Sequence, residues 1–315
     1  MRRRTFFVAL PAAFYAGRAQ AKPARLELAW YSSQTLSATA AQTFATQAAE
    51  LFPGAFQVEV AEIPPVVPFD VIGRASPLAS YYAPAFSGVE PILGLSAVPM
   101  LAATFDEAEA LLRLARPSYE RALARHGQVL LAVEPWRPAA LWSTFRLRSV
   151  SDLRGARFAL DETAYAGDGW AVLFARLQAE RSVYGEAELL LSGGYTASEA
   201  LAREFACVSE IFFAQQLTFL AANRAVFESL TGAQRDALLA IGRATEAELW
   251  RGIRAFVRRD RQDIAARGVL VSTEPPADLL EALRKAAEPD VRRWVAATGA
   301  EGATLLADYR RTIGF

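Results

Sequence analysis

The segment Ser151-Asp152-Leu153-Arg154-Gly155-Ala156-Arg157-Phe158 joins a turn to the start of a strand, and it sets the fold of the middle of this 315-residue chain. Ser149 is placed to cap a one-turn helix that ends at Gly155. Residues 156–160 are mostly apolar and predict a strand directly after that turn. A short helix, a glycine turn and a strand in this order are typical of one unit of an α/β protein.

The same alternation of strand and helix continues in both directions from this segment. Strands are predicted at residues 26–30, 56–60, 77–82, 128–133, 141–145, 188–191 and 207–213. Between them, helices are predicted at residues 38–51, 105–116, 117–126, 167–180 and 196–204, with Pro117 separating two of them. We therefore predict the α/β class.

The last hundred residues are predicted to be helical. Thr231 and Gln234 form a capping box, and apolar residues then recur at helical spacing as far as Ile264. No proline interrupts this stretch before Gly268, so about 35 residues form one helix of about 50 Å. A helix of that length can run across both lobes of a two-lobed protein. A further helix is predicted at 279–297, kinked at Pro289 and ending at Gly299.

The N-terminus has the form of an export signal. Arg2-Arg3-Arg4 precedes an apolar run at 6–16, and Ala19-Gln20-Ala21 fits a cleavage site, so we expect cleavage after Ala21. Export by the general secretory route and by the twin-arginine route both remain open. Without residues 1–21 the chain has 30 basic and 34 acidic residues, a net charge of −4. We expect the mature protein to be soluble and periplasmic.

The composition excludes several kinds of chemistry. A single His and a single Cys rule out a His/Cys metal site, and Cys207 can form no internal disulfide. His126 is the one possible triad base, but it lies at a predicted helix end where a cation is favoured for structural reasons. The chain has no nucleophile elbow, phosphate loop or dinucleotide-binding motif. With no basic patch either, we predict no catalytic residue, metal, cofactor or nucleic-acid partner.

Aromatic residues gather instead at the ends of predicted strands. In open α/β sheets, ligands bind outside the carboxyl ends of the strands, and aromatic walls suit a pocket for a small molecule. These aromatic positions are Trp30, Tyr31, Tyr81, Tyr82, Trp136, Trp142, Phe158, Tyr165 and Phe212.

Four segments resemble the solute-binding proteins of TRAP-type secondary transporters, the dicarboxylate-type periplasmic receptors. Residues 26–30 with 40–45 are similar to that family's first strand and helix. Residues 96–101 are similar to its small–apolar–proline–aromatic segment. Residues 151–158 are similar to its D-L-K-G turn and strand, and residues 223–234 are similar to its entry into the long helix.

The resemblance implies two α/β lobes that close around one solute, with a long helix spanning both. On that basis we divide the chain into a signal peptide (1–21), lobe I (22–142 and 216–255), lobe II (143–215 and 256–300) and a C-terminal helix across the lobes (301–315). The resemblance also implies a monomer that delivers a small solute, usually an organic acid, to membrane subunits.

The chain departs from the family at the residues that hold the solute. The family's usual Arg falls at Ala159 here, and a second one falls at Ala139. The Asn expected near the Cys207 strand is also missing. Arg137 and Arg146 are close enough in sequence to replace the missing cation, which would grip a carboxylate with two parallel hydrogen bonds.

We therefore predict a periplasmic receptor of a TRAP-type transporter that catalyses no reaction. Two alternatives stay open: a sensor or accessory protein on the same fold, and a periplasmic hydrolase. The predicted solute-binding residues are Trp30, Tyr31, Tyr82, Arg137, Trp142, Arg146, Phe158 and Glu210.

Overall fold

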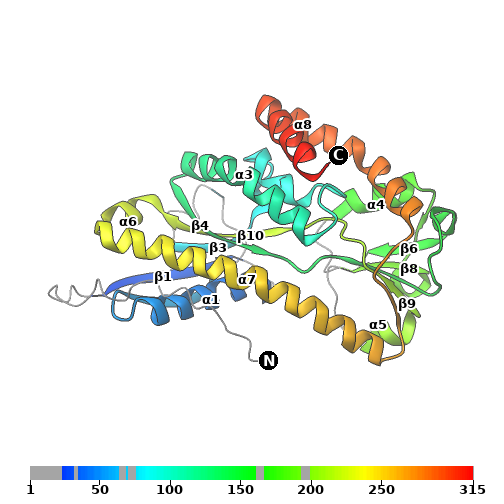
Figure 1. Cartoon of the computed structure of the whole chain (residues 1–315), viewed down its shortest axis with the longest axis horizontal. Helices are drawn as coiled ribbons and strands as arrows, with labels where there is room; N and C mark the ends of the chain where they lie inside the picture. Colours follow the sequence, from blue (N-terminus) through cyan, green and yellow to red (C-terminus); the bar gives the residue numbers. More distant parts are fainter. Residues whose placement is uncertain are drawn as a thin grey trace, which may run out of the picture.

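The protein has two lobes, each built on its own β-sheet (Figure 1). The computed structural model describes residues 23–31, 35–63, 69, 76–160, 167–192 and 199–314. The predicted export signal lies outside this range, and so do the side chain of Tyr31 and the predicted aromatic position Tyr165. The mixed α/β architecture with two lobes is as the sequence predicted.

The first sheet has the strand order β2-β1-β3-β10-β4. Its strands are β1 (Ala24–Tyr31), β2 (Phe56–Ile63), β3 (Leu78–Tyr82), β4 (Gln128–Pro135) and β10 (Leu217–Asn223). Strand β1 is parallel to β2 and β3, whereas β10 is antiparallel to both of its neighbours, β3 and β4. The strand from the late part of the chain is thus inserted between two early ones.

The second sheet has the order β11-β9-β5-β8-β6-β7. Its strands are β5 (Ala140–Ser143), β6 (Arg157–Leu160), β7 (Glu180–Arg181), β8 (Leu189–Ser192), β9 (Cys207–Ser209) and β11 (Leu270–Ser272). Here β5 is the inserted strand, antiparallel to both β8 and β9. Each lobe therefore contains one antiparallel strand, and the chain enters it directly from the other lobe.

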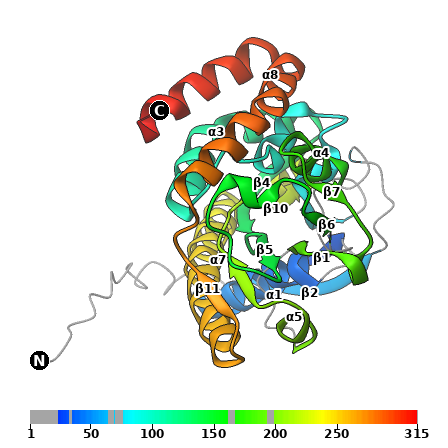
Figure 2. The same cartoon turned by 90° about the vertical axis from the view of Figure 1, so that its right-hand side faces the viewer.

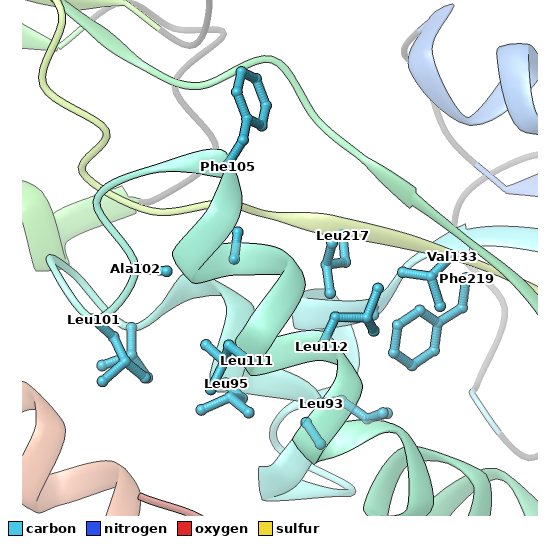
Figure 3. Close-up of a cluster of buried hydrophobic side chains, with 14 of the residues drawn as sticks. Leu93, Leu95, Leu101, Ala102, Phe105, Leu111, Leu112, Val133, Leu217 and Phe219 are labelled. Atoms are coloured by element: carbon cyan, nitrogen blue, oxygen red, sulfur yellow. The ribbon is translucent and has the colours of Figure 1, made fainter. Parts of the chain in front are cut away.

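Helices cover both faces of the first sheet, because alternate residues of its strands point to opposite sides. One face packs against α1 (Thr35–Leu51), with α6 (Arg224–Ser229) and the first half of α7 (Gly232–Ala266). The other packs against α3 (Phe105–Arg125) and the short 3₁₀ helices η2 (Ala83–Phe86) and η3 (Pro91–Ala97). Figure 3 shows Leu112 of α3 beside Leu217 and Phe219 of β10, and Leu111 beside Leu95 of η3.

The second sheet is covered in the same way. On one face, Phe158 of β6 packs on α4 (Gly167–Arg176) and on the part of α8 (Ala277–Ile313) that precedes Gly299. The opposite face packs on α5 (Glu199–Glu204) and the end of α7. Two 3₁₀ turns, η4 (Val150–Leu153) and η5 (Tyr184–Glu186), lie in its loops. Figure 2 shows α8 on the side of the molecule where α3 and α4 lie.

Helix α7 is the predicted long helix, and it packs on both lobes (Figure 1). At its start the Thr231 hydroxyl accepts the N–H of Gln234 at 3.3 Å, and the Gln234 side chain accepts the N–H of Thr231 at 3.0 Å, which completes the predicted capping box. The helix packs on β4 in the first sheet and on β11 in the second. Beyond it, Gly268 takes a φ of +87°, which suits the residue after a helix end.

Two helices differ from the prediction at a proline. Helix α3 runs through Pro117 without ending, because Ala115 and Tyr119 on either side are buried against the sheet and this packing outweighs one lost hydrogen bond. Helix α8 keeps helical backbone geometry through Pro289, where a kink was predicted. Its backbone leaves helical geometry at Gly299 (φ 65°, ψ −142°), as the predicted helix end requires, and this divides α8 into two arms.

The predicted lobe boundary after residue 142 is misplaced. Trp142 lies in β5, where it pairs with Leu190 and Val208 of the second sheet. The chain changes lobes at residues 136–139, between β4 and β5. The sequence could not show this, because β5 is an apolar strand that would fit either sheet.

Helix α7 approaches the edge strand β4 unusually closely. Strand β4 has an extra residue at Leu131, because Leu220 faces Ala132 while Ala221 faces Leu130. A Cβ atom added to Gly242 of α7 would lie only 2.3 Å from the Leu131 carbonyl oxygen. One turn later the Glu246 carboxylate accepts the Val133 N–H at 2.8 Å, so α7 also satisfies a donor of the edge strand.

We predict that Gly242→Ala destabilises the protein by about 1–3 kcal/mol, because the added methyl group would overlap backbone that cannot move freely. The matched control is Gly252→Ala on the same helix, where no atom lies within 4 Å of the added Cβ. That variant should be neutral or stabilised by about 1 kcal/mol, the helix-propensity gain. Denaturant unfolding measures both, and equal stabilities for the two variants would contradict the close contact.

Candidate functional site

The carboxyl ends of the parallel strands meet between the two lobes. In the first sheet β1, β2, β3 and β4 all end at one edge, and β10 begins there. In the second sheet β6, β8, β9 and β11 share an edge with the start of β5. The crossings at residues 136–139 and 210–216 connect these two edges, so the edges face each other. This is where an open α/β sheet binds ligands.

The two crossings are hydrogen-bonded to each other. Trp136 donates its backbone N–H to the Gln216 carbonyl at 2.9 Å, and the Gln215 side chain donates to the Trp136 carbonyl at 2.5 Å. The Trp136 indole donates to Thr218 at 2.6 Å, and the Tyr82 ring lies 4.7 Å from the Trp136 ring. Tyr82 therefore lies at the edge of the first sheet that faces the other lobe, as predicted. It contacts the crossing at residues 136–139, which with the crossing at 210–216 forms the hinge between the lobes.

The second crossing is also fixed to α7. Arg261 donates two hydrogen bonds to Glu210, at 2.6 and 2.8 Å, which joins the residue after β9 to the long helix. Burial raises the pKa of the Glu210 carboxyl, and the Arg261 charge opposes that rise. We predicted that Glu210 binds the solute, but in the structure both of its carboxylate oxygens accept hydrogen bonds from Arg261.

Neither candidate for the missing cation is placed as a carboxylate clamp. Arg137 lies over the Phe256 ring of α7, 4.1 Å from its centre. Burial lowers the pKa of Arg137, and Asp260 of α7 counteracts this. Arg146 follows the carboxyl end of β5, which is antiparallel to its neighbours, so Arg146 is exposed at the edge of the sheet farthest from the other lobe. It lies near Cys207, the first residue of β9.

Most of the predicted aromatic residues belong to cores. Phe158 is 1% exposed and stacks on Phe174 of α4 at 5.1 Å. Trp142 is fully buried, and Trp30 packs on the core between the first sheet and α1. The assignments of Phe158 and Trp142 were wrong, because alternation along a strand shows that a residue faces one side but not what covers that side. Trp30, half-buried at the end of β1, stays a prediction.

The position of the expected Arg lies in a continuous apolar row. Val208, Trp142, Leu190 and Ala159 are paired across four adjacent strands of the second sheet, and each is at most 3% exposed. A guanidinium at position 159 would enter this row without a charged neighbour in it. The row is therefore compatible with the small apolar Ala159 and unfavourable for a buried charge at this position.

Residues of both lobes line a cavity of about 320 Å³. Lobe I contributes the segment from Pro84 to Pro99, and lobe II contributes Gly169 and Trp170 in the first turn of α4. Trp294 of α8 completes the wall and donates its indole N–H to the Pro91 carbonyl at 3.1 Å. An apolar cavity with a few polar groups at its rim is typical of a small-molecule site.

The polar groups of this cavity suit an anion. The first turn of α4 has backbone N–H groups without helical partners, and it follows the carboxyl end of β6. Trp170 is 3% exposed, and its indole nitrogen has no partner among the described residues. Arg293 lies at the rim and pairs with Asp290 at 2.8 Å. Trp170 was not predicted from the sequence. The glycine-rich pattern Gly167-Asp168-Gly169 before it, which follows a strand and opens a helix, is the sequence feature that could have indicated it.

His126 does not line this cavity. It caps the end of α3, next to the first residue of β4, which is the edge of the first sheet opposite the hinge. Its Nε2 is 3.0 Å from Glu90, and its ring is 4.8 Å from the Phe69 ring. These contacts are those of a structural histidine at a helix end.

The fold matches known solute receptors over nearly the whole chain. An extracytoplasmic solute receptor of Bordetella pertussis that binds pyroglutamic acid is 22% identical, with a TM-score of 0.68 over 91% of this chain and 99% of that one. The ectoine-binding protein of the TeaABC TRAP transporter, in its apo state, is 14% identical, with a TM-score of 0.75 over 91% and 98%. A TRAP solute-binding protein of Ralstonia eutropha H16 with bound (S)-2-acetolactate is 17% identical, with a TM-score of 0.67 over 92% and 98%.

No protein-family model matches the sequence, and neither does any curated protein. Within the described residues, no helix is both long and apolar enough to cross a bilayer. The protein thus has the fold of the TRAP-type extracytoplasmic solute receptors.

Glu134 is an unusual buried acid at the edge between the lobes. It precedes the last residue of β4, is 6% exposed, and one of its carboxylate oxygens has no partner among the described residues. Burial raises the pKa of Glu134 well above its ordinary value, and a hydrogen bond from the Ala40 N–H opposes this only in part. The folded protein therefore holds this proton at pH values where the unfolded chain releases it.

We predict that the free energy of unfolding falls as the pH rises, because the folded state keeps the Glu134 proton that the unfolded chain releases. The loss begins at about pH 4.3, the ordinary value for glutamate in an unfolded chain, and continues up to the raised pKa of the folded state. Glu134→Gln should remove the dependence and be more stable than the parent at about pH 8, with a smaller difference at about pH 4. Glu59→Gln, at an exposed site on β2, is the control. Unfolding curves that shift equally for both variants would refute the prediction.

Proposed function

We propose that this protein is the extracytoplasmic receptor of a TRAP-type transporter and that it captures one small organic acid between its lobes. The cavity lined by both lobes is the observation that carries the proposal, because a solute bound there would contact helices of both lobes at the same time. The similarity in fold to receptors for pyroglutamate, ectoine and acetolactate supports it.

In this proposal the solute's carboxylate lies at the first turn of α4. Backbone N–H groups at a helix N-terminus favour an anion, and the Trp170 indole adds a donor in an apolar wall. The side chains of Trp170 and Trp294 enclose the rest of the solute. This arrangement replaces the Arg that the family places where Ala159 stands, and it needs neither Arg137 nor Arg146.

The remaining parts of the proposal follow from the class of protein. Residues 1–21 direct export, are removed after Ala21, and leave the receptor in the periplasm. It works as a monomer with membrane subunits and catalyses no reaction. Lobe I consists of residues 22–139 with the chain from β10 to the middle of α7, and lobe II consists of the rest of the chain up to Gly299. The arm after Gly299 packs back on lobe I through Tyr309, which donates to the Leu101 carbonyl at 3.0 Å.

A sensor or accessory role would use the same solute site, so it differs only in the partner. The hydrolase alternative has less support, because His126 is held by Glu90 at the opposite edge of the first sheet.

We predict that a small organic acid raises the melting temperature. Pyroglutamate, acetolactate and ectoine are the first probes, with neutral aromatic compounds as the comparison set. At a hundredfold excess over Kd, binding adds about 2.7 kcal/mol, which corresponds to roughly 5–10 °C in a domain of this size. A shift with the neutral aromatic compounds and none with the carboxylates would reject the organic acid.

We predict that Trp170→Phe weakens binding of the solute found in that screen by about three- to tenfold, because the ring remains while the indole donor is lost. Trp142→Phe is the matched control: Trp142 is also buried with an unpartnered indole nitrogen among the described residues, but it does not line the cavity. Isothermal titration calorimetry measures both affinities. An equal loss in the two variants would show that Trp170 acts through stability alone.

A further inference from the structure

A groove separate from the cavity lies between α3 and α7, beside the edge strand β4. It has a volume of about 560 Å³ and shares no residue with the cavity between the lobes. Ion pairs across the groove hold the two helices side by side. Arg116 of α3 pairs with both oxygens of Glu246 on α7, and Arg254 of α7 pairs with Asp106 and Glu109 of α3, each at 2.8 Å.

Three further arginines in the groove pair with no acidic side chain among the described residues. Arg113 and Arg243 have no hydrogen-bond or ion-pair partner among the described residues, and Arg251 donates only to the backbone carbonyl of Ala247, at 3.2 Å. All three are exposed. The groove is therefore a positive surface on a protein whose net charge without residues 1–21 is −4.

The shape of this surface suits an extended partner better than a single small ion. Arg243 and Arg251 are eight residues apart on α7, a distance of about 12 Å along the helix axis. Arg113 faces them from α3. Three cations spread over that length match carboxylates that are spaced along a chain. Trp250, in the groove wall, is 7% exposed, and its indole nitrogen has no partner in the described part of the chain.

We propose that the α3–α7 groove docks an acidic peptide segment of a partner protein, with Arg113, Arg243 and Arg251 binding its carboxylates. The ion pairs of Arg116 and Arg254 keep the groove in shape before the partner arrives, which lowers the cost of docking. Charge complementarity of this kind mainly sets the rate of association and the choice of partner. The proposal does not depend on the identity of the solute.

The test uses a labelled hexaglutamate peptide, with hexaglutamine as its uncharged counterpart, in fluorescence anisotropy at low and moderate salt. The intact protein should bind hexaglutamate saturably, more weakly as salt rises, and should not bind hexaglutamine. The triple variant R113Q/R243Q/R251Q should lose about tenfold in affinity, because each exposed ion pair contributes a few-fold.

The matched control is R258Q/R259Q/R267Q, which removes the same charge from exposed positions at the end of α7 and its cap, outside the groove. It should stay within about threefold of the parent. Hydrogen exchange with bound peptide should show protection at residues 109–116 and 243–254. Equal losses in the two variants, or no binding by the parent, would overturn the proposal. Competition by citrate at the same carboxylate concentration would also overturn it, since the groove would then be a site for small anions.

Discussion

The hydrogen bonds between the two crossings are the constraint on which the rest of this structure depends. The Trp136 N–H donates to the Gln216 carbonyl at the point where the chain changes lobes, and the Gln215 side chain donates to the Trp136 carbonyl, so two extended segments are held together. Because each crossing continues directly into the antiparallel strand of the next sheet, this contact fixes both sheets with their carboxyl edges facing. The cavity, the buried Glu134 and the position of α4 all follow from that arrangement.

Helix α7 keeps the crossings in place from outside. Its first half packs closely on β4, where Gly242 allows contact with the Leu131 carbonyl, and farther along Arg261 binds Glu210 just after β9. One rigid helix thus touches a strand of one lobe and the hinge of the other. The charges that sequence analysis assigned to a solute, those of Arg137 and Glu210, serve this attachment instead. Arg243 and Arg251, which are not part of this attachment, line the groove with α3.

In the proposed function, a helix end binds the solute's carboxylate in place of a side-chain cation. The apolar row through Ala159 removes the environment that a buried guanidinium needs, and the first turn of α4, which covers the opposite face of the second sheet, supplies the donors instead. A guanidinium donates two parallel hydrogen bonds to a carboxylate or a similar oxyanion, whereas a helix N-terminus with an indole donor binds an anion through neutral groups. Trp170 and Trp294 then define the shape of the site.

The sequence by itself determined the local structure: the alternation of strands and helices, the capping box of α7, the turn at Gly155 and the missing Arg at position 159. These depend on neighbours within a few residues, so periodicity and capping chemistry reveal them. Only the tertiary structure decided that β5 runs antiparallel, which places Arg146 at the far edge, and that Phe158 and Trp142 face helices instead of solute. The direction of a strand in its sheet and the element that covers each face are set by contacts between residues far apart in the chain. For the same reason Trp170 became visible as a site residue only when both lobes were in place.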